Sequence, residues 1–187
     1  AAAVEQQEQL TVYGDYDVDG ATSAALLIRL FRDLGLDAGY YIPDRLLEGY
    51  GPSGEALVKL GEQGSRLVVT VDCGAMAYDA LAQAKAAGIE VIVVDHHKCA
   101  PELPKAFALV NPNRLDEADE AASHGHLAAV GVAFPLVSVV GSTILAIVLM
   151  WVTVLPPPGY ALDPATGQPT GDLMPGYLRL LTPILNF

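Results

Sequence analysis

The stretch TVYGDYDVDGATS, residues 11–23, places three aspartates at alternate positions, Asp15, Asp17 and Asp19. Carboxylates this close repel one another unless a cation lies among them. The spacing also fits the first half of an EF-hand calcium loop, but that loop needs a Glu at its twelfth position, where this chain has Leu26. The residues before Asp15 predict a strand, whereas an EF-hand loop follows a helix. The pattern therefore indicates a cation site of another kind.

Acidic and histidine side chains also follow two later apolar runs. Asp72 comes directly after RLVVTV, and Asp95, His96 and His97 come directly after EVIVV. If these runs are parallel strands, their carboxyl ends meet at the same sheet edge as Asp15, where open α/β folds bind ligands. Asp and His ligands without thiolates suit Mn²⁺ or Mg²⁺, and this many carboxylates exceed what one ion needs. The pattern predicts two ions, a recurrent device for phosphoester hydrolysis.

Each of these groups has a simpler explanation when it is taken alone. Asp72 could cap a helix or bind a ribose. The pair His96–His97 could lie on the surface, and the charged residues of the segment 44–48 could form a loop ion pair that contributes little. Helix caps and surface pairs do not explain why these groups lie together at the predicted strand exits of one sheet. The combination favours a metal site.

The elements that must position these residues are strands that alternate with helices. Apolar runs predict strands at residues 10–14, 38–42, 66–71, 90–94 and 107–110. Apolar residues at helical spacing, in segments that finish on Gly, predict helices within residues 20–35, 53–64 and 77–88. Regular alternation of this kind predicts an α/β fold, with a parallel sheet of about five strands and helices on both faces.

Composition limits the classes of function. The chain has 187 residues, of which 52% are hydrophobic, and a formal net charge of −12. This charge argues against a broad basic surface for nucleic acid, although a local cation site can still bind phosphate. Cys73 and Cys99 lie far apart without a CxxC pair, so we predict neither zinc nor redox chemistry for them. The absence of a secretory signal at the start predicts a reducing, cytoplasmic location.

The sequence changes character after residue 111. Residues 112–126 predict an acidic loop, residues 136–155 carry no charge, and residues 156–187 have the composition of turns and linkers. The uncharged run is as long as the roughly 20 residues that a membrane span needs. It could instead be a core helix that continues from HLAAVGVAF, or a tail foreign to the fold, and we expect no membrane span. Its flanking charges give no orientation.

Four segments, in order along the chain, resemble the motifs of a known superfamily. The segments VYGDYDVDG, PDRLLEGYG, VDCG and VDHH are similar to motifs I to IV of the DHH phosphoesterases. The DxDxDG form of motif I and the EGYG segment resemble the RecJ branch, whose members are 5′→3′ exonucleases specific for single-stranded DNA. The resemblance covers residues 1–134 and implies a role in DNA repair and recombination. It divides the chain into a catalytic domain at 1–134, an apolar helix at 135–155 and a Pro/Gly-rich tail at 156–187.

The resemblance also implies a role for each motif residue in a site with two Mn²⁺ or Mg²⁺ ions. Asp15 and Asp17 would hold one ion, Asp19 and His96 would hold the second, and Asp72 would bridge both. The reaction would be in-line attack of activated water on a phosphodiester.

The remaining roles concern the substrate, which the resemblance implies to be the 5′ end of single-stranded DNA. His97 would approach the scissile phosphate and, with Asp72 and His96, form the catalytic set. Asp95 would orient the histidines without touching an ion. Arg45 is the best basic candidate for a substrate phosphate. No obligate protein partner is indicated.

Two alternatives to the exonuclease remain open. The chain could be another hydrolase of the superfamily, acting on oligoribonucleotides, cyclic dinucleotides or pyrophosphate, or an inactive fragment that only binds metal. The RecJ branch carries a further metal-binding Asp downstream of GVAF, but after Phe134 this sequence departs from that pattern. Its only later acids, Asp163 and Asp172, lie in Pro/Gly-rich surroundings. We therefore expect an incomplete catalytic domain and a poor nuclease, unless Asp172 substitutes.

Overall fold

A computed structural model describes residues 8–138 of the chain. The chain divides into two compact units, Ala1–Ser138 and Val139–Phe187, and the second lies entirely outside the described residues. The predictions for residues 156–187, and for most of the uncharged run 136–155, fall on that second unit. Among the described residues, no helix has both the length and the apolar character that crossing a bilayer requires.

Five parallel strands form one sheet in the order β2-β1-β3-β4-β5. The strands are β1 (Leu10–Gly14), β2 (Ala38–Tyr41), β3 (Leu67–Val71), β4 (Glu90–Val94) and β5 (Ala108–Val110). Every residue of the interior strand β1 is buried, as expected for a strand covered on both faces. The predicted α/β fold is confirmed, and no strand boundary differs from its prediction by more than one residue.

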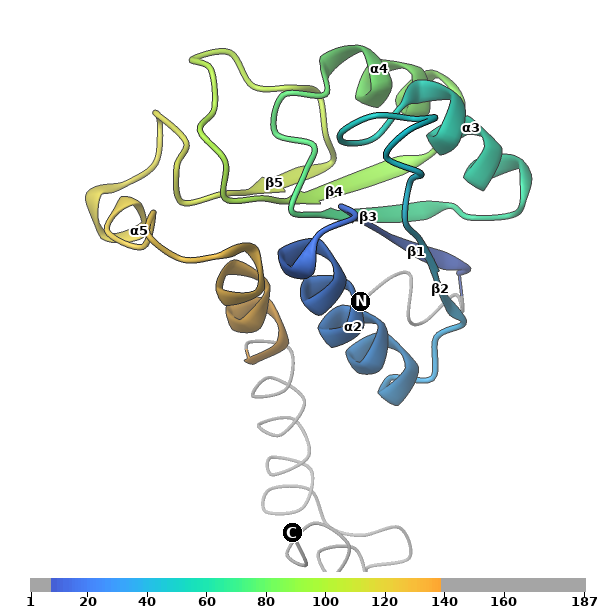
Figure 1. Ribbon diagram of the computed structural model, residues 1–187, viewed down its shortest axis with the longest axis horizontal. Coiled ribbons are helices and arrows are strands. Elements are labelled where there is room, and N and C mark those ends of the chain that lie inside the picture. Colours follow the sequence, from blue (N-terminus) through green and yellow to red (C-terminus); the bar gives the residue numbers. More distant parts are fainter. Residues whose placement is uncertain (1–7, 139–187) are drawn as a thin grey trace, which may run out of the picture. The chain divides into compact units, whose positions relative to one another are not determined.

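Helices cover both faces of this sheet, as predicted. They are α2 (Val18–Asp33), α3 (Gly54–Glu62), α4 (Tyr78–Ala86) and the short α5 (Asp119–Ala122). Residues 129–138 are also helical. Figure 1 shows α3 and α4 above the sheet, and α2 and the helical segment 129–138 below it.

The hydrophobic core consists of two layers, because successive side chains of a strand point to opposite faces of the sheet. Val68 of β3 packs in one cluster with Leu81 of α4. Its neighbour Val69 packs in the other cluster with Leu27 of α2 and with Val132. Both layers contain fully buried side chains. Packing on both faces of the sheet therefore holds the carboxyl ends of the strands in place.

The first helix begins earlier than the sequence predicts. The side chain of Asp17 caps α2 by accepting hydrogen bonds from the backbone N–H groups of Asp19 and Gly20, at 2.9 and 3.0 Å. The helix therefore starts at Val18 and includes Asp19 in its first turn. The prediction of an acidic loop for residues 112–126 is wrong at one place, because the short helix α5 lies within it.

Candidate metal centre

Three buried aspartates lie at the carboxyl ends of three neighbouring strands. Asp15 follows β1, Asp72 follows β3 and Asp95 follows β4. Each donates its backbone N–H to the last residue of the next strand in the sheet, at 3.3, 3.0 and 3.0 Å respectively. The sheet therefore fixes the backbone of all three acids, and the edge predicted from the sequence is formed as expected.

Two groups of side chains at this edge have the geometry to hold a metal ion. The first comprises Asp15, Asp17 and Asp72, and the second comprises Asp72, His96 and His97. Within each group the potential ligand atoms lie within 4.8 Å of one another. Asp72 belongs to both groups, so one carboxylate faces two sets of potential ligands.

The buried carboxylates of the first group fit a bound cation. Asp15 is 3% exposed and Asp72 is 1% exposed, yet the Oδ1 atom of each has no hydrogen-bond partner. The Nε2 atom of His96 lies 3.1 Å from Asp72 Oδ1 without forming a hydrogen bond. Buried carboxylate oxygens are costly unless a hydrogen bond or a cation satisfies them. A divalent cation among these oxygens would satisfy them.

Burial and mutual repulsion shift the pKa values of these acids. Burial, followed by the neighbouring Asp17, raises the pKa of Asp72 from 3.8 to about 7. Burial also raises the pKa of Asp15. The pKa of Asp17 is lowered, chiefly by the hydrogen bond that it accepts from the backbone of Gly20. Without a cation the cluster therefore retains a proton near neutral pH, and a cation must compete with that proton.

The backbone around the centre adopts unusual conformations. Asp72 has φ = 62°, and among the described residues it is the only non-glycine residue with a positive φ. Such conformations cost free energy and cluster at functional sites. Two residues later Gly74 has φ = 108°, and a Cβ there would lie 2.8 Å from the Thr70 hydroxyl. A Cβ on Gly20 would collide with the backbone of Asp15, so α2 packs directly against the Asp15 loop.

The two histidines are held in orientations that leave one ring nitrogen free. His96 Nδ1 lies 3.0 Å from the backbone carbonyl of Leu127 and must donate to it, since a carbonyl only accepts. His97 Nδ1 lies 2.7 Å from Asp95 Oδ1. In each ring the Nε2 atom is then available to bind a metal or to face a substrate.

Asp95 lies directly after β4, where its carboxylate contacts the ring of His97, and its predicted role of orienting both histidines stays a prediction. Its Oδ1 atom accepts hydrogen bonds from the backbone N–H groups of His96 and His97, at 2.7 and 3.1 Å, and contacts the ring of His97. Its Oδ2 atom accepts from the N–H of Ala75 at 3.0 Å. The ring of His96 is oriented by Leu127, which sequence reasoning missed. Burial lowers the pKa of His97, but the hydrogen bond and the charge of Asp95 outweigh this effect and raise it.

The structure places Asp19 and Arg45 at the margin of the centre. Asp19 is half-buried in the first turn of α2, and neither ligand group among the described residues includes it. Its assignment to the second ion stays a prediction. The guanidinium of Arg45 lies 5.0 Å from the ring centroid of Tyr16, and its charge favours the ionised form of Asp15. Arg45 thus stands beside the cluster, where a phosphate could reach it.

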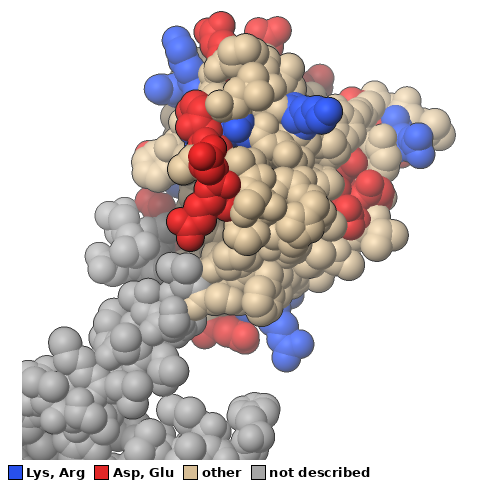
Figure 2. Space-filling view, turned by 90° about the vertical axis from the view of Figure 1, so that its left-hand side faces the viewer, with Lys and Arg blue, Asp and Glu red and all other residues tan. Residues whose placement is uncertain are grey.

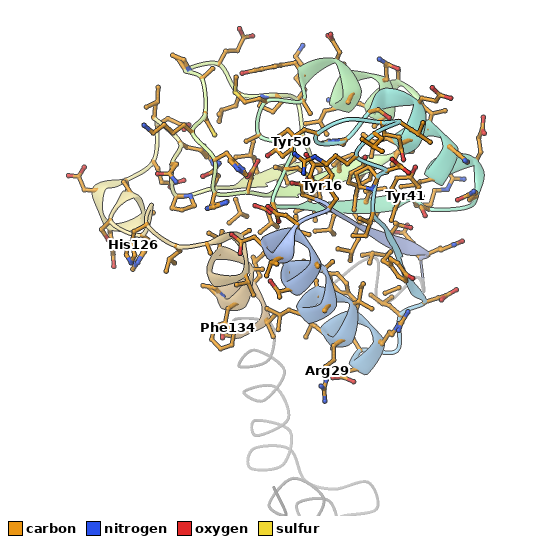
Figure 3. The ribbon with its side chains drawn as sticks, viewed as in Figure 1. Tyr16, Arg29, Tyr41, Tyr50, His126 and Phe134 are labelled. Atoms are coloured by element: carbon orange, nitrogen blue, oxygen red, sulfur yellow. The ribbon has the colours of Figure 1, made fainter. Side chains whose placement is uncertain are left out.

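Tyr50 is a residue of the site that sequence reasoning missed. Its hydroxyl donates to the backbone carbonyl of Asp72 at 3.2 Å and lies 3.2 Å from His97 Nδ1. The side chain is 57% exposed, and in Figure 3 it lies in the loop region above the sheet, whereas Arg29 lies far along α2. Its position in the EGYG segment was the signal available in the sequence.

Two asparagines in the NPN segment after β5 support the histidine loop from behind. Asn111 is 2% exposed, and its side-chain amide donates to the carbonyl of His97 at 2.8 Å. The amide of Asn113 donates to the carbonyl of His96 and, at 3.0 Å, to that of Gly125. Asn113 also donates its backbone N–H to Asn111 Oδ1 at 2.8 Å, which couples the two. The repeated Asn was the only sign of this role in the sequence.

The surface around this centre carries a negative balance of charge. Figure 2 shows the side of the molecule on which α5 lies, where acidic side chains form a stripe and Lys and Arg stand singly. Among the described residues on this face, basic side chains do not form a broad surface. Arg45 is a single basic residue beside the acidic cluster.

Comparison with known proteins identifies the family. Residues 9–150 match the DHH family, N-terminal domain, so the chain belongs to the DHH family.

Within the family the chain is similar to RecJ proteins. It is 42% identical over 134 residues to the single-stranded-DNA-specific exonuclease RecJ of Bacillus subtilis, covering 72% of this chain and 17% of that protein. The RecJ of Salmonella typhimurium is 44% identical over 135 residues, covering 72% and 23%. The chain thus spans about a fifth of the length of these curated relatives.

Solved structures show the same likeness. A crystal structure of exonuclease RecJ bound to manganese matches with a TM-score of 0.66 and 35% identity, over 84% of this chain and 37% of that one. RecJ from Thermus thermophilus in complex with Mn²⁺ matches with a TM-score of 0.61 and 31% identity, over 84% and 20%. Both of those proteins are bound to manganese, and this chain has groups of side chains that could hold a metal ion.

Proposed function

We propose that this chain is the catalytic part of a metal-dependent phosphodiesterase that degrades single-stranded DNA from its 5′ end. The observation that carries the proposal is the position of Asp72, which is buried, incompletely hydrogen-bonded and common to both groups of potential ligands. A carboxylate in this position is suited to bridge two cations. The similarity to RecJ exonucleases supports single-stranded DNA as the substrate.

The proposed site holds two Mn²⁺ or Mg²⁺ ions. Asp15 and Asp17 would bind one, His96 the other, and Asp72 both, in keeping with the two groups of ligand atoms. Asp19 is proposed as a further ligand of the second ion. When bound, paired ions of this kind lower the pKa of water and neutralise charge on a phosphodiester.

The protein's own residues orient the substrate. Since His97 Nδ1 is committed to Asp95, the Nε2 atom of His97 is presented to the scissile phosphate, and its raised pKa favours the charged form that pairs with a phosphate oxygen. Arg45, beside the Asp15 loop, would contact another phosphate of the same strand. The positive φ at Asp72 sets the direction in which its side chain leaves the backbone, independently of the ions.

The test is hydrolysis of 5′-phosphorylated single-stranded DNA by the purified chain with saturating Mn²⁺. We expect slow release of mononucleotides by the wild type, because the domain is expected to be incomplete, and none by Asp72→Ala. The control is Asp79→Ala, which removes an exposed acid from the first turn of α4 and should hydrolyse like the wild type. Equal turnover by Asp72→Ala and the wild type would contradict the proposal.

Parallel reactions separate the alternatives. Turnover of an oligoribonucleotide, a cyclic dinucleotide or pyrophosphate in preference to DNA would indicate another hydrolase of the family. Manganese binding without any turnover would indicate a fragment that only binds metal. The roles of Asp163 and Asp172 fall outside the described residues, and loss of turnover in Asp172→Ala would show that this acid completes the site. DNA repair, a cytoplasmic location and the absence of an obligate protein partner stay predictions.

A further inference from the structure

A cavity of about 310 Å³ lies at the carboxyl edge of the sheet, next to the metal centre. It is lined by the segment 50–52, by Gly74, Met76 and Ala77 of a second segment, and by Asp95 and His97. The first segment precedes α3, the second connects β3 to α4, and the two single residues follow β4. The cavity therefore opens between loops of the same sheet edge that carries the proposed ligands.

His97 separates this cavity from the proposed ion sites. Its ring belongs to the second ligand group and lies 4.6 Å from the ring of His96, between centroids. The same ring lines the cavity and meets Tyr50 edge-on at 5.8 Å. A phosphate held at the metal centre against His97 would therefore have the cavity beside it, where the nucleoside attached to that phosphate must continue.

The walls of the cavity are suited to an aromatic ring. Pro52 and Ala77 are apolar, Tyr50 offers an aromatic face, and Met76 offers a polarisable thioether. The side chains of Tyr50 and Met76 are 57% and 52% exposed, so they are accessible to a ligand. Met76 Sδ also accepts a hydrogen bond from the N–H of Ala100 at 3.4 Å, which holds the thioether in place.

Three polar groups of the cavity are already engaged within the protein. The Tyr50 hydroxyl is hydrogen-bonded to the backbone of Asp72, and Asp95 accepts hydrogen bonds from backbone and ring groups through both of its oxygens. The carbonyl of Gly51 accepts from the Tyr13 hydroxyl at 3.1 Å. These groups are therefore not free to distinguish one base edge from another, whereas stacking is tolerant of base identity.

We propose that this cavity is a subsite for the nucleoside of the terminal nucleotide and that it accepts all four bases. Its volume of about 310 Å³ lies at the lower end of the roughly 300–1,000 Å³ typical of ligand pockets, which suits one nucleoside. The inference rests on the proposed function, which places the terminal phosphate at the metal centre. It adds that the cavity recognises the attached base by shape and stacking.

Binding of mononucleotides to the Mn²⁺-loaded chain, measured by calorimetry, tests the subsite directly. Thymidine 5′-monophosphate should bind about tenfold more tightly than 2-deoxyribose 5-phosphate, because only the nucleotide has a base to stack. The four deoxynucleoside monophosphates should bind within about threefold of one another. Equal binding of the nucleotide and the sugar phosphate would overturn the proposal.

Substitutions in the cavity test whether the preference for the nucleotide over the sugar phosphate arises there. Ala77→Phe fills the cavity and should abolish the advantage of the nucleotide over the sugar phosphate. Ala82→Phe makes the same change at an exposed position of α4 and should retain it. Because Ala77→Phe could disturb folding, Met76→Ala provides a second variant at an exposed position, which should reduce the advantage. Retention of the full advantage in both cavity variants would overturn the assignment.

Hydrolysis separates this inference from the proposed function. The wild type should cleave single-stranded DNA with a 5′-terminal thymidine about tenfold faster than the same strand with a terminal abasic site. Equal cleavage of both strands would overturn the subsite and leave the phosphodiesterase intact. Cleavage of neither strand, with the binding preference retained, would overturn the phosphodiesterase and leave a nucleotide-binding subsite.

Discussion

The two edges of the sheet contain cavities of similar size but of different chemistry. At the carboxyl edge the cavity of about 310 Å³ adjoins three buried aspartates, and the cavity of about 330 Å³ at the amino ends of β4 and β5 is lined by residues such as Lys85, Glu90 and Lys105. The three residues named at the amino edge are exposed, so water can solvate their charges. At the carboxyl edge, Asp15 and Asp72 each bury an oxygen without a hydrogen-bond partner.

This contrast shows that the size of a cavity does not mark a functional site in this fold. The carboxyl edge differs from the amino edge because it has buried carboxylates and a positive φ at Asp72. Both features lower the stability of the folded protein. Such features persist where a ligand or a reaction makes use of them.

The largest expected effect is on metal affinity when the shared carboxylate is removed. Loss of a residue that only orients a ligand typically lowers metal affinity about 10–100-fold, so Asp72→Asn should lower Mn²⁺ affinity more than about a hundredfold. Lys105→Ala, at the amino-edge cavity, should leave it unchanged. Titration of Mn²⁺ followed by calorimetry measures both. Similar affinities for the two variants would remove the distinction between the edges.

A smaller loss of affinity is expected when the support of the histidine loop is removed. Asn111→Ala deletes the buried hydrogen bond to the carbonyl of His97 and should lower Mn²⁺ affinity about 10–100-fold. It should also cost about 1–3 kcal/mol of stability. Val132→Ala, in the core below the sheet, is the matched control, with a loss of stability but unchanged affinity. Equal affinity for Mn²⁺ in the two variants would show that Asn111 has only a structural role.

Close packing at the carboxyl edge predicts an effect on stability. Gly20→Ala introduces a Cβ against the backbone of Asp15 and should cost about 1–3 kcal/mol, despite the better helix propensity of Ala. Gly39→Ala in β2 is the control, because the nearest atom to its new Cβ lies at an ordinary 3.7 Å. Urea unfolding compares the two. If Gly20→Ala were as stable as the wild type, α2 would not be pressed against the Asp15 loop as described.

The smallest effect is a dependence of stability on pH in the metal-free protein. The pKa of Asp72 is raised from 3.8 to about 7, so between these values the folded state holds a proton that the unfolded state has released. The stabilisation that comes from this proton is full below the lower pKa and is lost as the pH rises through the higher one.

The expected result is a metal-free protein that becomes less stable from about pH 4 to about pH 7, with a smaller slope in Asp72→Asn. Saturating Mn²⁺ should restore stability at the higher pH, because it binds the folded state. Urea unfolding in the presence of a chelator, at a series of pH values, measures the slope. Asp79→Asn, at an exposed acid of α4, should retain the slope of the wild type.

Much of the site could be predicted because its main residues directly follow strands. The run RLVVTV is short and rich in β-branched residues, which favours a buried strand, and the residue after such a strand, Asp72, lies at the carboxyl edge. The same reasoning located Asp15 and Asp95. The supporting residues Asn111 and Leu127 could not be located, because they reach the histidines from loops whose path depends on packing.

The sequence by itself determined the parallel sheet, because the period of its apolar residues fixes which segments are strands and which are helices. Only the tertiary structure decided how the three alternating aspartates separate. Alternation would place them on one side of an extended chain, but Asp17 caps α2 and Asp19 enters the first helical turn. Residues two apart on a helix do not face the same way, so Asp15 and Asp17 join Asp72 in one ligand group and Asp19 does not.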